Sequence, residues 1–205
     1  MAESRVSVYE WVLLTLVLVV LAWSGLDPHD RFTWFLEVAP VLIGLPIIIV
    51  TRARFPLTPL LCLLLSIHAV ILMVGGKYTY AEVPAGFWVQ DLLGFERNHY
   101  DRLGHFAQGF VPAILAREIL WRRSPLRGSR WLGFVVVSIC LAFSAFYELI
   151  EWWTAAASGA ASDAFLGTQG DPWDTQWDMF LALIGANTSL LLLRQVHHRQ
   201  LASLS

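Results

Sequence analysis

Long runs without charge alternate along the chain with short charged segments. Three runs in the first half, 11–26, 32–51 and 55–76, approach the roughly 20 apolar residues that a helix needs to cross a bilayer, and only Glu37 interrupts them. A helix satisfies all of its backbone hydrogen bonds internally, which the bilayer core demands of any segment that crosses it. Each run therefore predicts a transmembrane helix.

The uncharged runs of the second half, 103–116, 131–147 and 179–193, are shorter. A crossing there must include polar neighbours to reach the required length. We therefore predict an all-α fold, a polytopic bundle of about six transmembrane helices. The spans are expected near 9–26, 33–51, 56–75, 100–120, 131–152 and 173–193, which make one integral membrane domain over 1–205.

The composition indicates that lipid surrounds the protein. Apolar residues make up 57% of the chain and charged residues 15%, whereas soluble domains carry roughly 45–50% and about 25%. An ordinary soluble domain is therefore excluded, and membrane lipid is the expected partner. Nucleic acid is not expected as a partner, because no basic stripe extends beyond one short loop. The sequence points to no particular protein partner.

Arginine and lysine are divided unevenly between the two ends of the predicted helices. Cytoplasmic loops are enriched in both residues, so the richer end is expected to face the cytoplasm. The richer end carries Arg5, Arg52, Arg54, Arg122, Arg123, Arg127, Arg130, Arg194 and Arg199. The other end carries Arg31, Lys77, Arg97 and Arg102. This bias predicts that both termini are cytoplasmic.

Polar residues gather at the outer ends of the last three predicted spans, in pairs three or four residues apart that share a helix face. The pairs are Asp101 with His105, Glu148 with Glu151, and Asp174 with Asp178. Acidic residues within a membrane are costly, so a cation, bound protons or the guanidinium of Arg102 and its neighbours should neutralise them. Carboxylates with an imidazole suit magnesium, manganese, zinc or iron. A divalent metal ion is thus the candidate cofactor, with Asp101, His105, Asp174 and Asp178 as ligands.

Further residues could carry chemistry beside such an ion. Glu148 or Glu151 is expected to act as the general base toward a metal-activated water. Arg102, or Arg97 near it, has the planar guanidinium that holds a phosphate. These roles predict metal-dependent hydrolysis or transfer on a lipid or envelope substrate.

The same residues also have structural interpretations. Asp171 before Pro172 is typical of a helix N-cap followed by proline at the first helical position. Glu151 can lie in water at the membrane interface. His105 can serve as the hydrogen-bond partner of a carboxylate without any metal.

Other polar residues are expected outside the site. Glu37 can join the cluster but is placed at the membrane interface, and His197 and His198 are placed in a solvated tail. The chain has no zinc-protease, phosphate-loop or nucleophile-elbow motif, so whether it is an enzyme stays open. A proton- or cation-coupled permease or sensor would use the same carboxylates, and a structural protein would hold them in an internal salt-bridged network.

Three strings in the second half resemble those of a known family. They are YDRLGH at 100–105, YELIEW at 147–152 and GTQGDPWDTQWDM at 167–179. They are similar to the YjdF-type family of bacterial inner-membrane proteins, and the resemblance spans nearly the whole chain. It implies a multi-pass protein of the bacterial inner (plasma) membrane and supplies no reaction.

A fainter similarity links the chain to VanZ-like membrane proteins. It rests on an Asp-x-x-x-His helix, then a Glu helix, then an Asp-containing helix followed by Asn187. The chain lacks a clear counterpart to the arginine that follows the Glu helix in that family, so the role of that arginine is not transferred.

Overall fold

The computed structural model describes residues 6–158 and 168–204, and all regular structure in these residues is helical. The prediction of an all-α membrane helix bundle is confirmed. Arg5 and Gly167, which entered the sequence analysis, lie outside the described residues. In chain order the elements are α1 (Val8–Gly25), α2 (Arg31–Thr51), α3 (Pro59–Tyr78), η1 (Tyr80–Glu82), α4 (Pro84–Leu93), α5 (Tyr100–Arg123), α6 (Trp131–Ser158) and α8 (Asp174–Ala202).

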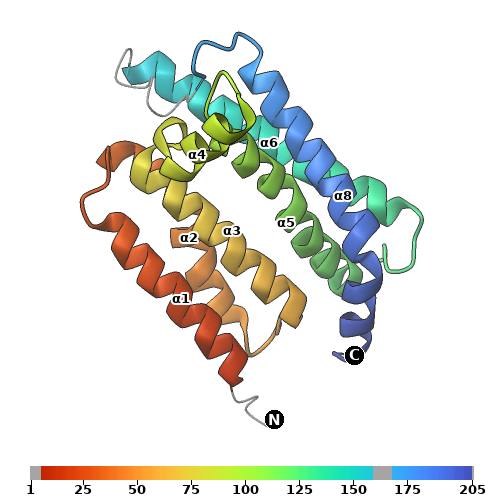
Figure 1. Ribbon diagram of the computed structural model, residues 1–205. Helices are drawn as coiled ribbons and strands as arrows, with labels where there is room; N and C mark the ends of the chain where they lie inside the picture. Colours follow the sequence, from red (N-terminus) through yellow and green to blue (C-terminus); the bar gives the residue numbers. More distant parts are fainter. Residues whose placement is uncertain (1–5, 159–167, 205) are drawn as a thin grey trace.

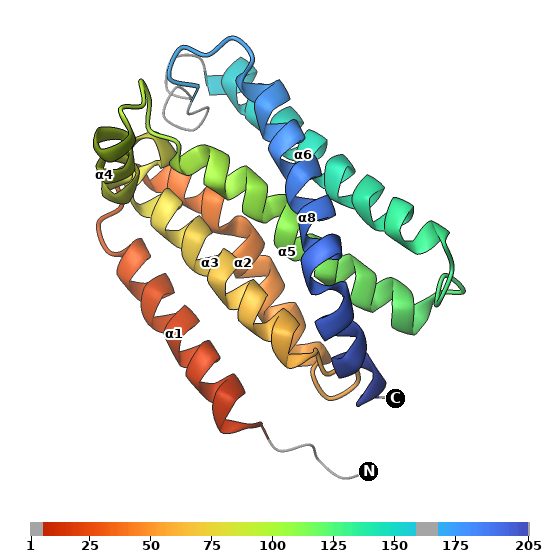
Figure 2. The same ribbon diagram turned by 45° about the vertical axis from the view of Figure 1, so that its right-hand side comes forward.

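Six of the described helices are long, and they run alternately up and down in one bundle (Figures 1 and 2). By length and composition, five of them, α1, α2, α3, α6 and α8, are suited to cross a membrane. The sixth, α5, is 24 residues long and contacts α3, α6 and α8. Helix α1 begins and α8 ends at the same end of the bundle.

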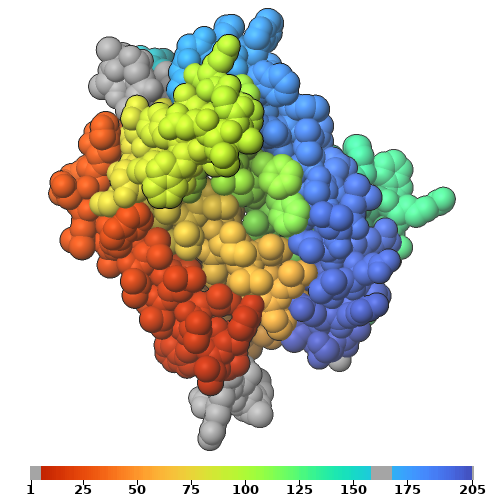
Figure 3. All heavy atoms as spheres, viewed as in Figure 1, coloured from red at the N-terminus to blue at the C-terminus, as the bar shows by residue number. Residues whose placement is uncertain are grey.

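The helices form two groups that meet where α3 contacts α5. Helices α1 and α2 pack against α3, whereas α5 packs most extensively against α8. In the space-filling view α5 shows only a small area between α4 and α8 (Figure 3). Large apolar side chains cover the outside of the bundle; Val50 is 79% exposed and Leu191 83%. Lipid tails can cover such a surface without the cost that water would impose.

Two glycines allow α5 and α8 to approach closely. A Cβ atom added to Gly109 of α5 would overlap the carbonyl oxygen of Ala182, and one added to Gly185 of α8 would overlap the carbonyl oxygen of Phe106. Small residues bring helix backbones together in membranes, where packing replaces the hydrophobic effect as the driving force. The contact between Gly109 and Ala182 lies one turn beyond the polar residues at the starts of both helices.

Helix α2 begins with a side-chain cap from Asp30. Its carboxylate accepts a 2.6 Å hydrogen bond from the backbone N–H of Thr33, and this bond lowers the pKa of Asp30. The stabilisation is therefore present above the pKa of the unfolded carboxyl group and is lost as the pH falls through the lower folded pKa.

Replacing this cap should destabilise the protein in a pH-dependent way. Asp30→Ala is expected to lower the free energy of unfolding by about 1 kcal/mol at neutral pH, measured by denaturant titration in detergent. The difference from wild type should shrink once acid has protonated Asp30. An equal loss at neutral and acidic pH would show that the charged carboxylate is not what stabilises the helix.

A buried ionic network lies at the end of the bundle where α1 begins and α8 ends. Glu118 of α5 is fully buried, and its carboxylate lies 2.9 Å from His197 Nε2 of α8. It also accepts hydrogen bonds from Thr58 Oγ1 at 2.7 Å and Arg122 Nη1 at 2.9 Å. Arg117 Nη1 lies 2.7 Å from the other nitrogen of the imidazole. The prediction that His197 belongs to a solvated tail is wrong, because α8 continues past it while packed on α5.

Candidate functional site

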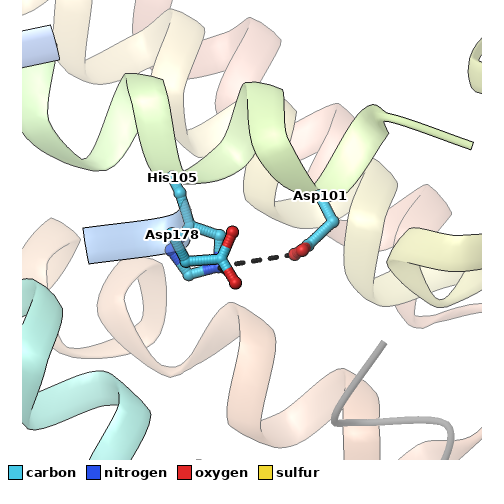
Figure 4. Close-up of side chains that lie close together, drawn as sticks. All are labelled: Asp101, His105 and Asp178. Atoms are coloured by element: carbon cyan, nitrogen blue, oxygen red, sulfur yellow. Dashed lines mark ion pairs between the residues drawn. The ribbon is translucent and has the colours of Figure 1, made fainter. Parts of the chain in front are cut away.

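Side chains from three helices converge near the opposite end of the bundle. His105 of α5 is central: its Nε2 lies 3.4 Å from Asp101 Oδ1 and 3.8 Å from Asp178 Oδ2 of α8. Its Nδ1 lies 3.8 Å from Glu148 Oε1 of α6. Figure 4 shows Asp101, His105 and Asp178 pointing toward one another. These four residues together with Glu151 are called the carboxylate–histidine cluster below.

Two carboxylate oxygens of the cluster have no hydrogen-bond partner among the described residues. They are Oε1 of Glu148 and Oδ1 of Asp178, in residues that are only 7% and 2% exposed. A buried carboxylate without compensating hydrogen bonds is costly. The cluster therefore needs a cation or protons to balance its charge.

The cluster contains two groups of possible metal ligands that share His105. Asp101, His105 and Asp178 form one group, and His105, Glu148 and Glu151 form the other; within each, one ligand atom per residue lies within 4.8 Å of the others. Carboxylate oxygen and imidazole nitrogen are donors that divalent ions accept. The residues present therefore fit a divalent metal ion.

The imidazole of His105 is oriented by a neighbour on its own helix. Its Nδ1 lies 3.1 Å from Oε1 of Gln108. A carbonyl oxygen only accepts hydrogen bonds, so Nδ1 carries a proton when it makes this contact. The other ring nitrogen, Nε2, faces Asp101 and Asp178. Asp101, His105 and Gln108 lie four and three residues apart, on one face of α5.

Glu37 of α2 belongs to the surroundings of the cluster, which the sequence analysis gave as the alternative to an interfacial position. The residue is 7% exposed and interacts electrostatically with Asp101 and His105. It lies inside the bundle, because α2 packs against α3 with Glu37 beside Gly76. Its position as the one acid in an otherwise apolar run is the signal for this role.

Asp174, predicted as a metal ligand, lies outside both ligand groups. Its Oδ1 accepts a 2.7 Å hydrogen bond from Arg97 Nη1. Asp174 is the first residue of α8, so it lies one turn further out than Asp178 and reaches the segment that precedes α5.

Arg102, predicted to hold a phosphate during catalysis, forms an ion pair with Asp171. Its Nη2 lies 2.8 Å from Asp171 Oδ2, and Arg97 Nη1 lies 3.5 Å from the same oxygen. A helix N-cap was one interpretation of Asp171. Its Oδ1 accepts a hydrogen bond from the backbone N–H of Trp173 at 2.9 Å, as an N-cap side chain does, in the turn just before α8. Partial burial, with Arg102 and Arg97 nearby, lowers the pKa of His99.

Comparisons with known proteins agree with this architecture. The profile of the family described as "Predicted membrane protein (DUF2238)" matches residues 9–199. The chain is 56% identical over 188 residues to "Inner membrane protein YjdF" of Escherichia coli (strain K12). The aligned region covers 92% of this chain and 90% of that protein. No solved structure matches. The resemblance to the YjdF-type family is confirmed, the chain is a multi-pass inner-membrane protein, and the similarity to VanZ-like proteins stays a prediction.

Proposed function

This chain belongs to the DUF2238 family of membrane proteins, and on that premise we propose that it is a metal-dependent membrane enzyme. A divalent ion in the carboxylate–histidine cluster would serve hydrolysis or transfer on a lipid or envelope substrate. The observation that carries this proposal is the pair of buried, unpartnered oxygens on Glu148 and Asp178. A divalent cation within the cluster supplies the counter-charge that both need.

Asp101, Asp178 and Nε2 of His105 are the proposed ligands. Donor atoms about 2.1 Å from one ion lie roughly 3 to 3.5 Å apart, and Nε2 lies 3.4 and 3.8 Å from the two carboxylate oxygens. Small side-chain movements would therefore complete the coordination. The contact of Nδ1 with Gln108 is the kind of outer hydrogen bond that orients metal-binding histidines.

Glu148 is the proposed general base. A bound divalent ion makes a water acidic enough to lose its proton near neutral pH. Glu148 lies on the other side of the imidazole from the ligands, and its Oε1 is free of hydrogen bonds within the described part of the chain. From that position a carboxylate oxygen would accept the proton through an intervening water. Glu151 belongs to the same ligand group and adds a further carboxylate to the cluster.

The cluster is proposed to face the periplasm. It lies at the end of the bundle away from the start of α1 and the end of α8. The termini share their end with the loops rich in arginine, which the distribution of positive charge assigns to the cytoplasm. A substrate in the outer leaflet or the cell envelope would then meet the ends of α5, α6 and α8.

Metal analysis tests the proposal directly. Protein purified in mild detergent, stripped with chelator and re-equilibrated with Zn²⁺ or Mn²⁺ should retain about one ion per chain. Asp178→Asn and His105→Ala should each weaken binding by more than about 100-fold, since losing a direct ligand costs more than losing an outer contact. The measurements are elemental analysis by mass spectrometry and calorimetric titration.

Glu118→Gln provides a matched control for these variants. Glu118 is as buried as Asp178 but lies in the network at the other end of the bundle, so this variant should bind metal as the wild type does. Wild-type protein without stoichiometric metal, or Asp178→Asn that keeps it, would overturn the proposed function.

A proton- or cation-coupled permease or sensor is the second candidate. It is favoured by the excess of buried acid, since one divalent ion balances only two of the carboxylates and Glu37 adds another beside them. In proteoliposomes containing a pH-sensitive dye, an imposed cation gradient should then move protons with wild-type protein and not with Glu37→Gln. A dye signal that does not respond in either case would exclude this candidate.

A further inference from the structure

Two arginines outside the carboxylate–histidine cluster converge on a single carboxylate oxygen. Arg102 Nη2 lies 2.8 Å and Arg97 Nη1 3.5 Å from Oδ2 of Asp171. Arg97 also donates a 2.7 Å hydrogen bond to Asp174. The charges of the four side chains balance, and the group lies partly open, with side chains between 6% and 24% exposed.

Hydrogen bonds between two segments hold this group in place. The backbone N–H of Asn98 donates to Oε1 of Gln169 at 3.1 Å, and Nε2 of Gln169 donates to the carbonyl oxygen of Asn98 at 2.9 Å. Asn98 is fully buried and donates to the carbonyl oxygen of Val83 at 3.0 Å. The segment that bears Arg97 is thus joined to the segment that bears Asp171, so the arginines are positioned before any ligand arrives.

The two arginines lie beside the proposed metal ligands, near the outer ends of α5 and α8. Arg102 follows Asp101 directly on α5, and Asp174, the partner of Arg97, precedes Asp178 by one turn of α8, about 5.4 Å along the axis. Asp174 also interacts electrostatically with Asp101. A group held by the arginines would therefore lie beside the cluster, between it and the outer surface.

The surroundings of the arginines are aromatic and apolar. The guanidinium of Arg102 lies over the ring of Trp177 at 5.4 Å from its centre. Trp177 is 45% exposed and the neighbouring Trp173 64%. Tryptophan gathers where a membrane meets water, at the level of lipid head groups. The two arginines thus lie at the depth where lipid phosphates are found.

We propose that Arg97 and Arg102 bind the phosphate of a membrane lipid, which replaces Asp171 as their shared partner. Guanidinium groups match phosphate oxygens as they match a carboxylate, and a terminal monoester phosphate, such as that of phosphatidic acid, carries more charge and more acceptor oxygens than Asp171 does. Asp171 keeps its other oxygen on the backbone N–H of Trp173. It acts as a built-in competitor that neutralises the arginines until the lipid arrives.

This inference rests on the proposed function in one respect: the bound lipid is the substrate presented to the metal. It names that substrate class as a phosphate-bearing lipid. Binding of the lipid is a property of the arginines alone, so it can be measured on protein stripped of metal.

The test uses calorimetric titration of the full-length, chelator-treated protein in detergent with three probes. Dioctanoyl phosphatidic acid carries lipid and phosphate, dioctanoylglycerol carries the lipid alone, and inorganic phosphate carries the phosphate alone. Phosphatidic acid should bind at least about tenfold more tightly than either of the others. Arg102→Gln and Arg97→Gln should each lose about 10- to 100-fold in affinity, the range for hydrogen bonds between charged groups.

Asp171→Asn removes the competing charge and should bind phosphatidic acid several-fold more tightly. A gain in affinity cannot result from misfolding, so this variant keeps the test independent of it. Arg31→Gln is the matched control: Arg31 is exposed at the same end of the bundle, on α2, and its loss should leave binding unchanged. Equal binding of dioctanoylglycerol, equal binding of inorganic phosphate, unchanged affinity in Arg102→Gln, or weaker binding in Asp171→Asn would each overturn the inference. Lipid binding without stoichiometric metal overturns the proposed function alone, and metal binding without lipid selectivity overturns this inference alone.

Discussion

Gly185→Ala is expected to destabilise the protein by about 3 kcal/mol, the upper part of the range for overpacking. The added Cβ would meet the carbonyl oxygen of Phe106 and the backbone nitrogen of Phe110 on α5. Backbone atoms cannot rotate away as a side chain can, so α5 and α8 must separate. The expected result is a loss of unfolding free energy in denaturant titrations, with weaker metal binding because His105 and Asp178 move apart.

Gly133→Ala is the matched control for this substitution. Gly133 also lies in a helix, α6, but a Cβ there meets nothing within 4 Å. Alanine favours helix over glycine by up to about 1 kcal/mol, so this variant should be as stable as wild type or more so. Equal effects of the two substitutions would show that helix propensity, and not the approach of α5 to α8, decides the outcome.

Glu118→Ala is expected to destabilise the protein by about 3–5 kcal/mol, the cost of removing one partner from a buried ionic network. The substitution leaves Thr58, His197 and Arg122 without the carboxylate that they share. The free energy of unfolding, measured in detergent by denaturant titration, should report the loss. Metal binding should remain once the protein is folded, because the network and the carboxylate–histidine cluster lie at opposite ends.

Glu10→Ala is the comparison for this second prediction. Glu10 pairs with Arg52 at 3.0 Å at the same end of the bundle, but both side chains are about a quarter exposed, and such pairs contribute at most about 1 kcal/mol. The double variant Glu118→Ala with His197→Ala should lose less than the sum of the single losses, since both remove one contact. Additive losses would mean that the two residues stabilise the fold independently.

The sequence predicted most of the helices because their cause is local. An uncharged run long enough to cross a bilayer must form a helix there, whatever it packs against. The prediction was less complete in the second half, where α5 and α8 carry polar residues over several turns. Helix α8 continues to Ala202, well beyond the predicted end near 193, because Glu118 and Arg117 of α5 provide partners for His197.

Helix periodicity was enough to predict which site residues lie close together when they belong to the same helix. Asp101 and His105 lie on one face because four residues make about one turn, and the structure places them 3.4 Å apart. The same argument treated Asp174 and Asp178 as equivalent. The two residues have different partners in the structure because they lie one turn apart along α8. Asp178 reaches His105, whereas Asp174 reaches Arg97.

The sequence by itself therefore determined that the protein lies in a membrane, that its fold is helical and that its acids gather at one end of the helix bundle. Scarce charges in an apolar chain are costly unless they meet inside the bundle, so their positions indicate a site. Only the tertiary structure decided which acids meet. Glu37, far from the others in sequence, enters through the packing of α2 on α3, and Asp171 takes the arginines, because such contacts depend on how helices pack and not on spacing within one helix.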